Sequence, residues 1–233
     1  MIKEMFPDAF AEVFFSHRQF KLSGGHDIYH AIRVAETAYR IAINEWNNEH
    51  VAQLAGLAGL CHNADRVAQK MLNFGRQPVP EQEIKILITF WLGNEGGLSP
   101  GDLREVINAV LKHENQNSKQ DSKVLIALRD ADRVVNLDLD LVIRSGQHYH
   151  DVPAVDFEHF LDDPNATYSE PRSSLRDIAY ALDWVDEKSP YCICTSFGRK
   201  LGEERAIALR GFIDTLRKQL EETGLLSARK EQT

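Results

Sequence analysis

The chain has 233 residues, of which 43% are hydrophobic and 27% are charged. This length allows one domain with a substantial core, and the composition is that of an ordinary globular protein. The formal net charge of −8 at pH 7 argues against general affinity for nucleic acid polymers or anionic membranes.

The cysteines and the N-terminus bear on the cellular compartment. Three cysteines, Cys61, Cys192 and Cys194, make a disulfide framework improbable. Lys3 and Glu4 stand where a signal peptide would become apolar, and no run of about 18 apolar residues could span a membrane. We therefore expect a cytoplasmic protein. The Cys192 and Cys194 pair has no second cysteine pair beside it, so its role stays open.

Helical periodicity dominates the first part of the chain. Residues 1–22 carry phenylalanines at helical spacing, and a Ser-Gly-Gly stretch at 23–25 ends that helix. Residues 26–46 have two apolar stripes, which predict a largely buried helix. Residues 51–62 are small and apolar almost throughout, which predicts a helix that other helices approach closely.

Clear start signals mark the helices that follow. Residues 81–92 form an apolar-periodic helix after a Gly/Pro-punctuated loop. Ser99, Pro100 and Asp102 make a strong helix start, with a cap, a proline in the first turn and an early acid. Ser122 opens a further helix.

The last third of the chain is more irregular. Residues 138–171 are loop-rich, 172–186 are predicted to be helical, and 188–195 form a loop. Residues 198–222 have the pattern of a long amphipathic helix. Strand signals are few, so we expect an all-α fold.

Three polar side chains fall on inward faces of separate helices: His30, His62 and Asp132. Taken one at a time, each has an ordinary explanation. A histidine can bond a backbone carbonyl, and Asp132 can pair with Arg129 or Arg133. Three such residues together point instead to a shared site. Two imidazoles and one carboxylate suit a divalent transition metal (Mn, Fe, Ni, Co or Zn), with Mg as an alternative.

The motifs around these residues resemble those of the HD-domain superfamily of metal-dependent phosphohydrolases, in particular its small bacterial stand-alone members. They are His30-Ala-Ile-Arg33-Val34, Leu60-Cys61-His62-Asn63 and Asp130-Ala-Asp132-Arg133. The resemblance implies a single HD-like helical bundle over residues 1–233. Its core covers about 23–140, and 141–233 form a loop-rich segment and C-terminal helices packed on that core.

The resemblance also implies roles for particular residues. His30, His62, Asn63 and Asp132 would be the metal ligands. The literal pair His26-Asp27 precedes the first ligand in the family pattern, so His26 is expected to orient His30 or to contact the substrate.

One departure from the family pattern matters for the chemistry. Where the family has a His-Asp pair, this chain has His62-Asn63. Asparagine offers a neutral carbonyl oxygen, so it ligates weakly and lowers the negative charge of the site.

Four further residues complete the predicted site. Arg33 and His113 are expected to bind the phosphate, with Arg66 beside them. Asp65, one turn from His62, is a candidate for positioning or deprotonating water.

We therefore expect a metal-dependent phosphohydrolase acting on a small phosphorylated molecule, a phosphate ester or anhydride such as a nucleotide. The first alternative is a degenerate HD module that binds a nucleotide or a partner without hydrolysis, which Asn63 motivates. The second is an all-α scaffold whose polar residues pair with one another. His148 and His150 lie outside the resemblance, and their role stays open, as does the oligomeric state.

Overall fold

The structure is a computed structural model that describes residues 1–22, 24–75 and 77–226. Over these ranges the chain consists of helices and connecting loops, with one isolated β-bridge between Asp156 and Phe160. The prediction of an all-α fold is confirmed. Ser23, part of the predicted break, lies outside the described residues.

The N-terminal region contains two helices where the sequence predicted one. Helix α1 covers Ile2–Met5 and α2 covers Pro7–Gln19. Phe6 separates them, with a backbone φ of −134°. Pro7 follows as the first residue of α2, a position where its missing N–H and fixed φ favour a helix start.

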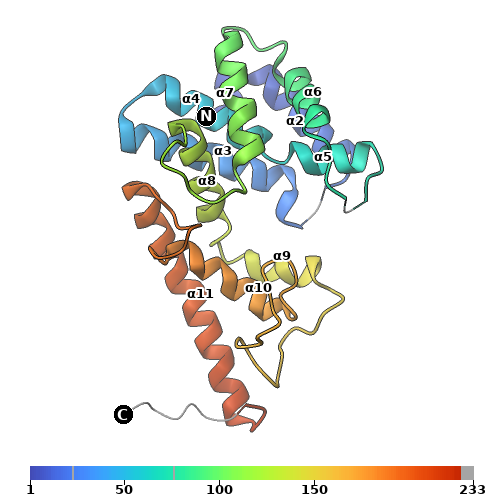
Figure 1. Cartoon of the computed structure of the whole chain (residues 1–233), viewed down its shortest axis with the longest axis vertical. Helices are drawn as coiled ribbons and strands as arrows, with labels where there is room; N and C mark the ends of the chain where they lie inside the picture. Colours follow the sequence, from blue (N-terminus) through green and yellow to red (C-terminus); the bar gives the residue numbers. More distant parts are fainter. Residues whose placement is uncertain (23, 76, 227–233) are drawn as a thin grey trace.

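Helices α3 (Ile28–Trp46) and α4 (Glu49–Cys61) lie at the centre of the upper part of the molecule, and α5 (Ala64–Met71) follows α4 at its edge (Figure 1). Helix α3 packs closely on α4. A Cβ atom added at Gly59 would lie 2.7 Å from the Cα of Ala35, so only glycine allows this approach. Because α4 ends at Cys61, His62 and Asn63 lie at the junction between α4 and α5.

Three more helices enclose this centre, and their predicted starts are confirmed. They are α6 (Glu81–Leu92), α7 (Pro100–Lys112) and α8 (Lys123–Val135). Ser99 and Asp102 form a reciprocal capping box at the start of α7. The Ser122 side chain accepts the backbone N–H of Leu125 at the start of α8.

The C-terminal part contains α9 (Leu141–His148), α10 (Ser174–Tyr180), the 3₁₀ helix η2 (Ala181–Val185) and α11 (Ser196–Glu222). Helix α9 lies in a segment predicted to be loop-rich. The helix predicted over residues 172–186 is divided into α10 and η2.

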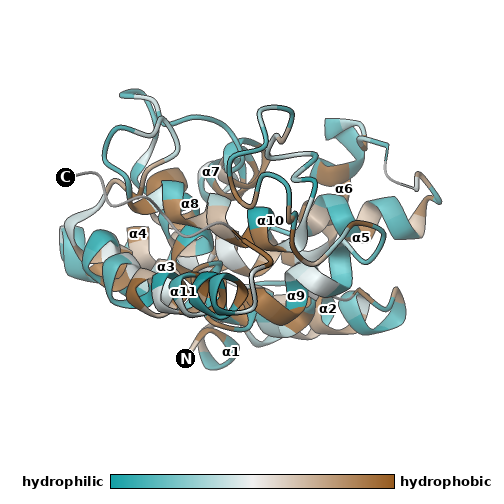
Figure 2. Ribbon diagram, turned by 90° about the horizontal axis from the view of Figure 1, so that it is seen from below, coloured by the Kyte–Doolittle hydropathy of each residue, from teal (hydrophilic) through white to brown (hydrophobic). Residues whose placement is uncertain are grey.

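The apolar core has two clusters. The larger one is formed by α1 to α8, and the smaller one by the last residues of α8 together with α9, α10, η2 and α11. Figure 1 shows these as an upper and a lower group of helices, with α8 between them and α11 running down one side. Figure 2 looks along α11 and shows hydrophobic and hydrophilic residues around it. Among the described helices, none has the length and apolar character needed to cross a membrane.

Asp130 joins the two groups. This buried carboxylate on α8 accepts the backbone N–H groups of Cys194 and Thr195 at 3.0 and 2.7 Å, and the Thr195 hydroxyl at 2.8 Å. Thr195 is in turn the N-cap of α11. The start of the longest helix is therefore fixed to α8, and with it the loop that precedes α11.

Candidate metal centre

His30, His62 and Asp132 meet inside the molecule, as the sequence predicted. Each offers a ligand atom, and these atoms lie within 4.8 Å of one another. His30 comes from α3, His62 from the end of α4 and Asp132 from α8. Both histidines are buried, and the Asp132 side chain is 23% exposed.

Local structure fixes the backbone of His30 and the ring of His62. The Asp27 side chain caps α3 by accepting the backbone N–H of His30 at 2.8 Å, which fixes the first turn of that helix. His62 Nδ1 donates to the Gly59 carbonyl at 2.7 Å. Because that carbonyl only accepts, the proton of His62 is on Nδ1 and its Nε2 carries a lone pair.

The distances around Asp132 differ for the two histidines. His30 Nε2 donates to Asp132 Oδ1 at 3.1 Å. His62 Nε2 lies 3.8 Å from the same oxygen, which is too far for a hydrogen bond. Both Nε2 atoms therefore face one carboxylate oxygen, in an arrangement that three ligands of a single ion would have.

For His62 and Asp132 the electrostatics favour the protonation states that metal ligands need. Burial lowers the pKa of His62 well below its usual value, so the ring is neutral. Burial would raise the pKa of Asp132, but the hydrogen bond from His30 and the nearby imidazoles hold it well below its usual range. A neutral imidazole and an ionised carboxylate are therefore present together.

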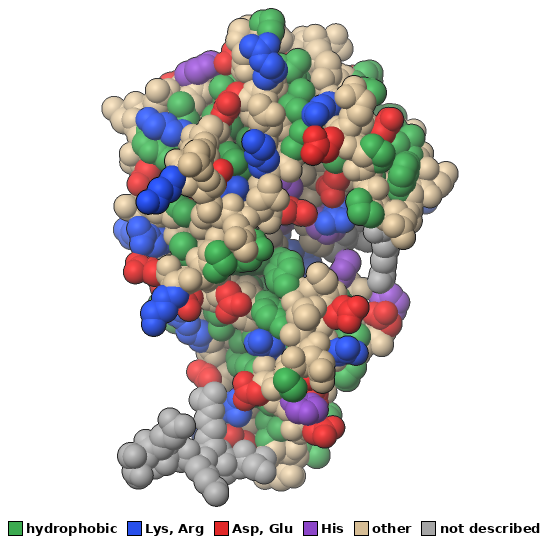
Figure 3. Space-filling model, in the orientation of Figure 1, with side chains coloured by type: hydrophobic (Ala, Val, Ile, Leu, Met, Phe, Trp, Pro, Cys, Tyr) green, Lys and Arg blue, Asp and Glu red, His purple; other side chains and the backbone are tan. Residues whose placement is uncertain are grey.

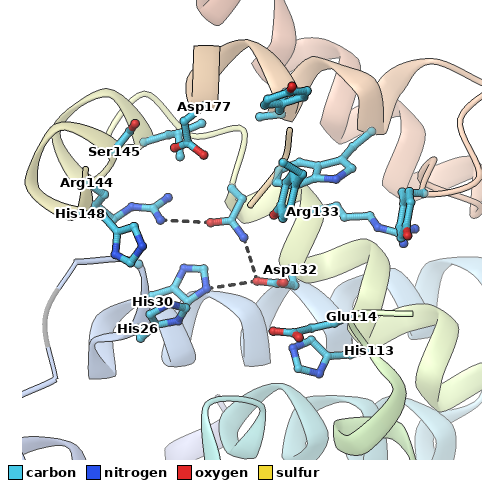
Figure 4. A pocket seen from close by; sticks show the side chains of 18 of the residues that line it. His26, His30, His113, Glu114, Asp132, Arg133, Arg144, Ser145, His148 and Asp177 are labelled. Carbon is cyan, nitrogen blue, oxygen red and sulfur yellow. Dashed lines mark hydrogen bonds and ion pairs between the residues drawn. The ribbon is translucent and has the colours of Figure 1, made fainter. Parts of the chain in front are cut away.

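Asn136 and Arg144 extend this group, and the sequence analysis missed both. Asn136 Nδ2 donates to Asp132 Oδ1 at 3.0 Å, and Arg144 Nη1 donates to Asn136 Oδ1 at 3.0 Å. Figure 4 shows this chain of contacts as dashed lines. Asn136 follows Asp132 by four residues, which was a local signal for the first contact. Arg144 gave no such signal, because its position depends on how α9 packs.

Asn63, the residue that departs from the family pattern, bonds to His26. The Asn63 Oδ1 and His26 Nδ1 atoms are 3.1 Å apart. Asn63 Nδ2 is buried and has no hydrogen-bond partner among the described residues. Burial, followed by the charge of Arg66, lowers the pKa of His26 to about 4, so this ring is neutral at pH 7. The structure thus places Asn63 beside the metal group with its oxygen directed to another side chain.

Asp65 and Arg66 lie beside each other at the start of α5. Arg66 Nε is 3.2 Å from Asp65 Oδ2, and Arg66 Nη2 is 3.4 Å from Glu114 Oε1. His113 is the C-cap residue of α7, and its Nδ1 donates to the Val110 carbonyl at 2.6 Å. The side chains that line the cavity between the two groups of helices include Asp65, Arg66, His113 and Glu114.

Arg33 has a different environment from the other predicted site residues. Its Nη1 donates to Asp138 at 3.0 Å and its Nη2 donates to Asp140 at 2.6 Å. It is not among the described residues that line the cavity. Its two acidic partners tie α3 to the segment before α9, which is an ordinary role for a half-exposed arginine.

The metal group opens into a cavity of about 740 Å³ between the upper and lower groups of helices. Figure 3 shows this face hollowed at that level, with histidine side chains in the hollow. His148 from α9 lines the cavity, whereas His150 is not among its described lining residues.

Cys192 and Cys194 lie in the loop that precedes α11. The Cys192 carbonyl accepts from Asn117 and Arg133.

A second group of possible ligands lies on the surface. Asp156, His159 and Asp163 also place ligand atoms within 4.8 Å of one another, and all three are half-buried. Asp156 already accepts the backbone N–H groups of Glu158 and His159, as a turn-forming aspartate does. The buried group of His30 and its partners is therefore the better candidate.

No protein-family model matches the chain, and no curated protein matches it. The resemblance to HD-domain hydrolases therefore stays a prediction carried by the sequence motifs. Over its described residues, the molecule is a helical protein in which two histidines and an aspartate form a group that could hold a metal ion.

Proposed function

We propose that the chain is a metal-dependent phosphohydrolase of the HD type, acting on a small phosphate ester or anhydride. The observation that carries the proposal is the convergence of His30, His62 and Asp132 from three helices. This group lies at the wall of a cavity that also presents several guanidinium groups. Cations and metal ligands around one cavity suit a phosphorylated substrate.

The donor set fits a divalent transition metal. Two imidazole nitrogens and one carboxylate oxygen are a ligand set of manganese, iron, nickel, cobalt and zinc, and magnesium would be bound less well. Such an ion, when bound, would supply the Lewis acid for phosphoryl chemistry. The chain itself keeps His62 neutral and Asp132 ionised, and it holds the His62 ring through Gly59.

The guanidinium groups would bind the phosphate. Arg144 is 11% exposed and Arg66 is 34% exposed, and both line the cavity. Guanidinium donors offset the negative charge on phosphate oxygens, and they do so more strongly where water is partly excluded. His113 directs its Nδ1 to the Val110 carbonyl, so its Nε2 is the ring nitrogen left to contact a phosphorylated ligand.

Asp65 is our candidate for orienting or deprotonating the attacking water. It lines the cavity, and its carboxylate is 27% exposed. Its contact with Arg66 couples the two side chains. A substitution of Asp65 would therefore be expected to affect the position of Arg66 as well as the proton transfer.

Asn63 supports a second candidate function, a module that binds its ligand without hydrolysing it. The Asn63 oxygen is engaged with His26, and asparagine adds no negative charge to the metal group. A weaker metal site would still leave the cavity and its cations available for a phosphorylated ligand.

Turnover measurements separate the two. The manganese-loaded protein is assayed against nucleoside mono-, di- and triphosphates and simple phosphate esters, beside a His62→Ala variant whose helix content is checked by circular dichroism. The hydrolase proposal predicts turnover that His62→Ala abolishes. Stoichiometric metal without turnover favours the binding module, and the absence of bound metal contradicts the hydrolase proposal.

A further inference from the structure

The cavity has two chemically different walls. Its metal-side wall comes from the upper helices and carries histidine, aspartate and arginine side chains. The other wall comes from the C-terminal part of the chain and is rich in aromatic rings. The chain has six tyrosines and three tryptophans, and five of these nine line the cavity: Tyr149, Tyr168, Tyr180, Trp184 and Tyr191. We call these five the aromatic wall.

These rings remain partly open to the cavity. None of the five is fully buried, and Tyr168 and Tyr191 are 62% and 40% exposed. Large rings left open to a cavity form the kind of surface that a ligand covers. Trp184 also packs against the apolar core of the lower helices, but the four tyrosines do not belong to that core. Core packing therefore does not explain why the tyrosines gather here.

Tyr180 is held in place at one side. The guanidinium carbon of Arg176 lies 4.0 Å from the centroid of the Tyr180 ring, and the Tyr168 ring lies 6.1 Å away with its plane at 67°. A cation over one ring and an edge contact to another fix the orientation of both. The ligand would therefore meet a preformed aromatic surface.

A carboxylate stands on the same side of the cavity. Asp177 comes from α10, and Figure 4 shows it across the cavity from His30 and Asp132. Burial raises the pKa of Asp177, although a hydrogen bond from Ser145 and, to a smaller extent, the positive charge of Arg144 offset part of this. An ionised carboxylate only accepts hydrogen bonds, so Asp177 would select a ligand group that donates.

We infer that the aromatic wall and Asp177 bind the base of a nucleoside phosphate, with Asp177 accepting from an amino group of that base. The inference rests on the proposed function for the phosphate end of the ligand. A planar heterocycle covers aromatic rings and presents N–H donors at its edge, whereas a bare sugar phosphate would leave the rings open. The cavity volume of about 740 Å³ is within the usual range for small-molecule sites.

Tryptophan fluorescence tests this without any hydrolysis. Of the three tryptophans only Trp184 lines the cavity, while Trp91 is fully buried and Trp46 ends α3. Full-length protein is titrated with nucleosides, ribose 5-phosphate and inorganic phosphate. Nucleosides are expected to quench the emission, and the two base-free compounds are not. Trp184→Phe should lose this response and Trp46→Phe should keep it. Quenching that survives in Trp184→Phe, or no response to any nucleoside, would overturn the inference.

The role of Asp177 is tested by base preference. Calorimetric affinities are compared for cytidine against uridine and for adenosine against inosine. The wild-type protein is expected to prefer the amino-bearing base of at least one pair, and Asp177→Asn to reduce that preference roughly tenfold. Asp186→Asn, an exposed position that does not line the cavity, should leave it unchanged. An unaltered preference in Asp177→Asn would overturn the assignment of Asp177.

The two proposals fail in different ways. Nucleoside binding without turnover of any phosphate ester would remove the hydrolase proposal and leave the base site in place. Turnover of ribose 5-phosphate as fast as that of nucleotides, without nucleoside binding, would remove the base site and leave the hydrolase proposal in place.

Discussion

His62 Nε2 lies 3.8 Å from Asp132 Oδ1, and the two side chains share no hydrogen bond. His62 is instead anchored on its other nitrogen by Gly59, and Asp132 by His30 and Asn136. His62 is thus held on the nitrogen that points away from Asp132, whereas the partners of Asp132 bond Oδ1, the same oxygen that faces His62. Backbone and neighbouring side chains therefore set the geometry of the group before any ion enters it.

The first prediction follows from the close approach of α3 and α4 at Gly59. Gly59→Ala is expected to destabilise the protein by roughly 3 kcal/mol, because the added methyl group would meet the backbone of Ala35. Gly211→Ala on α11 is the matched control, since nothing lies within 4 Å of its added Cβ. It should stabilise the protein by up to about 1 kcal/mol, because alanine favours helices. Urea denaturation measures both changes, and equal effects would contradict the close packing.

The second prediction concerns Asn63, which stands where the family pattern has an aspartate. Asn63 is 2% exposed, so Asn63→Asp should lower the melting temperature of the metal-free protein by burying a charge beside Asp132. The same carboxylate should raise the affinity for manganese at least about tenfold and restore the melting temperature when metal is added. Calorimetry and thermal denaturation measure the two effects.

Asn44→Asp is the control for this change, because it adds the same charge at an exposed position on α3. It should alter neither manganese affinity nor the metal dependence of melting. If Asn63→Asp behaves like Asn44→Asp, Asn63 does not face the metal group.

Asn136 provides the third prediction. Because its side chain fixes Asp132 Oδ1, Asn136→Ala is expected to weaken manganese binding by about tenfold, as loss of a partner behind a ligand usually does. Asn44→Ala serves as the control, and its metal affinity should equal that of the wild type. Unchanged affinity in Asn136→Ala would show that His30 alone orients the carboxylate.

Asp121 and Arg129 give a prediction about pH. Arg129 Nη1 and Asp121 Oδ2 are 2.6 Å apart, and the arginine side chain is 3% exposed. Burial would raise the pKa of Asp121, but the hydrogen bond from Arg129 holds it below its usual value. Removing the carboxylate leaves a buried cation with fewer partners, so Asp121→Ala should cost about 3 kcal/mol at neutral pH.

The sign of the pH dependence follows from the lowered pKa. The ionised carboxylate stabilises the wild type at pH values above its unfolded-state pKa, and this contribution is lost as the pH falls through the lower folded-state pKa. The difference between Asp121→Ala and wild type should therefore shrink below about pH 4. The exposed Asp214→Ala should stay within about 0.5 kcal/mol of the wild type throughout. A difference for Asp121→Ala that is independent of pH would contradict the ion pair.

The sequence predicted best those helices whose ends carry local signals. The capping box of Ser99 and Asp102 and the cap at Ser122 need only neighbouring residues, so their helices begin as predicted. Helix α9 was missed because its N-cap, Asp140, makes no side-chain cap hydrogen bond. Its eight residues are supported by packing on α10 and on the 3₁₀ helix η1 (Gly24–His26), which the local sequence does not reveal.

The same division applies to the site. His30, His62 and Asp132 were found because each interrupts an apolar stripe of a long helix. Arg144, Asp177 and the aromatic wall were missed, because they reach the cavity through the packing of short elements and loops. Arg33 was included on the strength of its motif, and only the structure shows that two aspartates engage it.

Metal content tests the central claim most directly. Wild-type protein, His62→Ala and His159→Ala are each incubated with manganese, freed of excess ion and analysed for metal per chain. We predict stoichiometric metal in the wild type and in His159→Ala, which alters only the surface group, and its loss in His62→Ala. A wild-type protein without metal, or a His62→Ala variant that retains it, would contradict a metal centre at His30, His62 and Asp132.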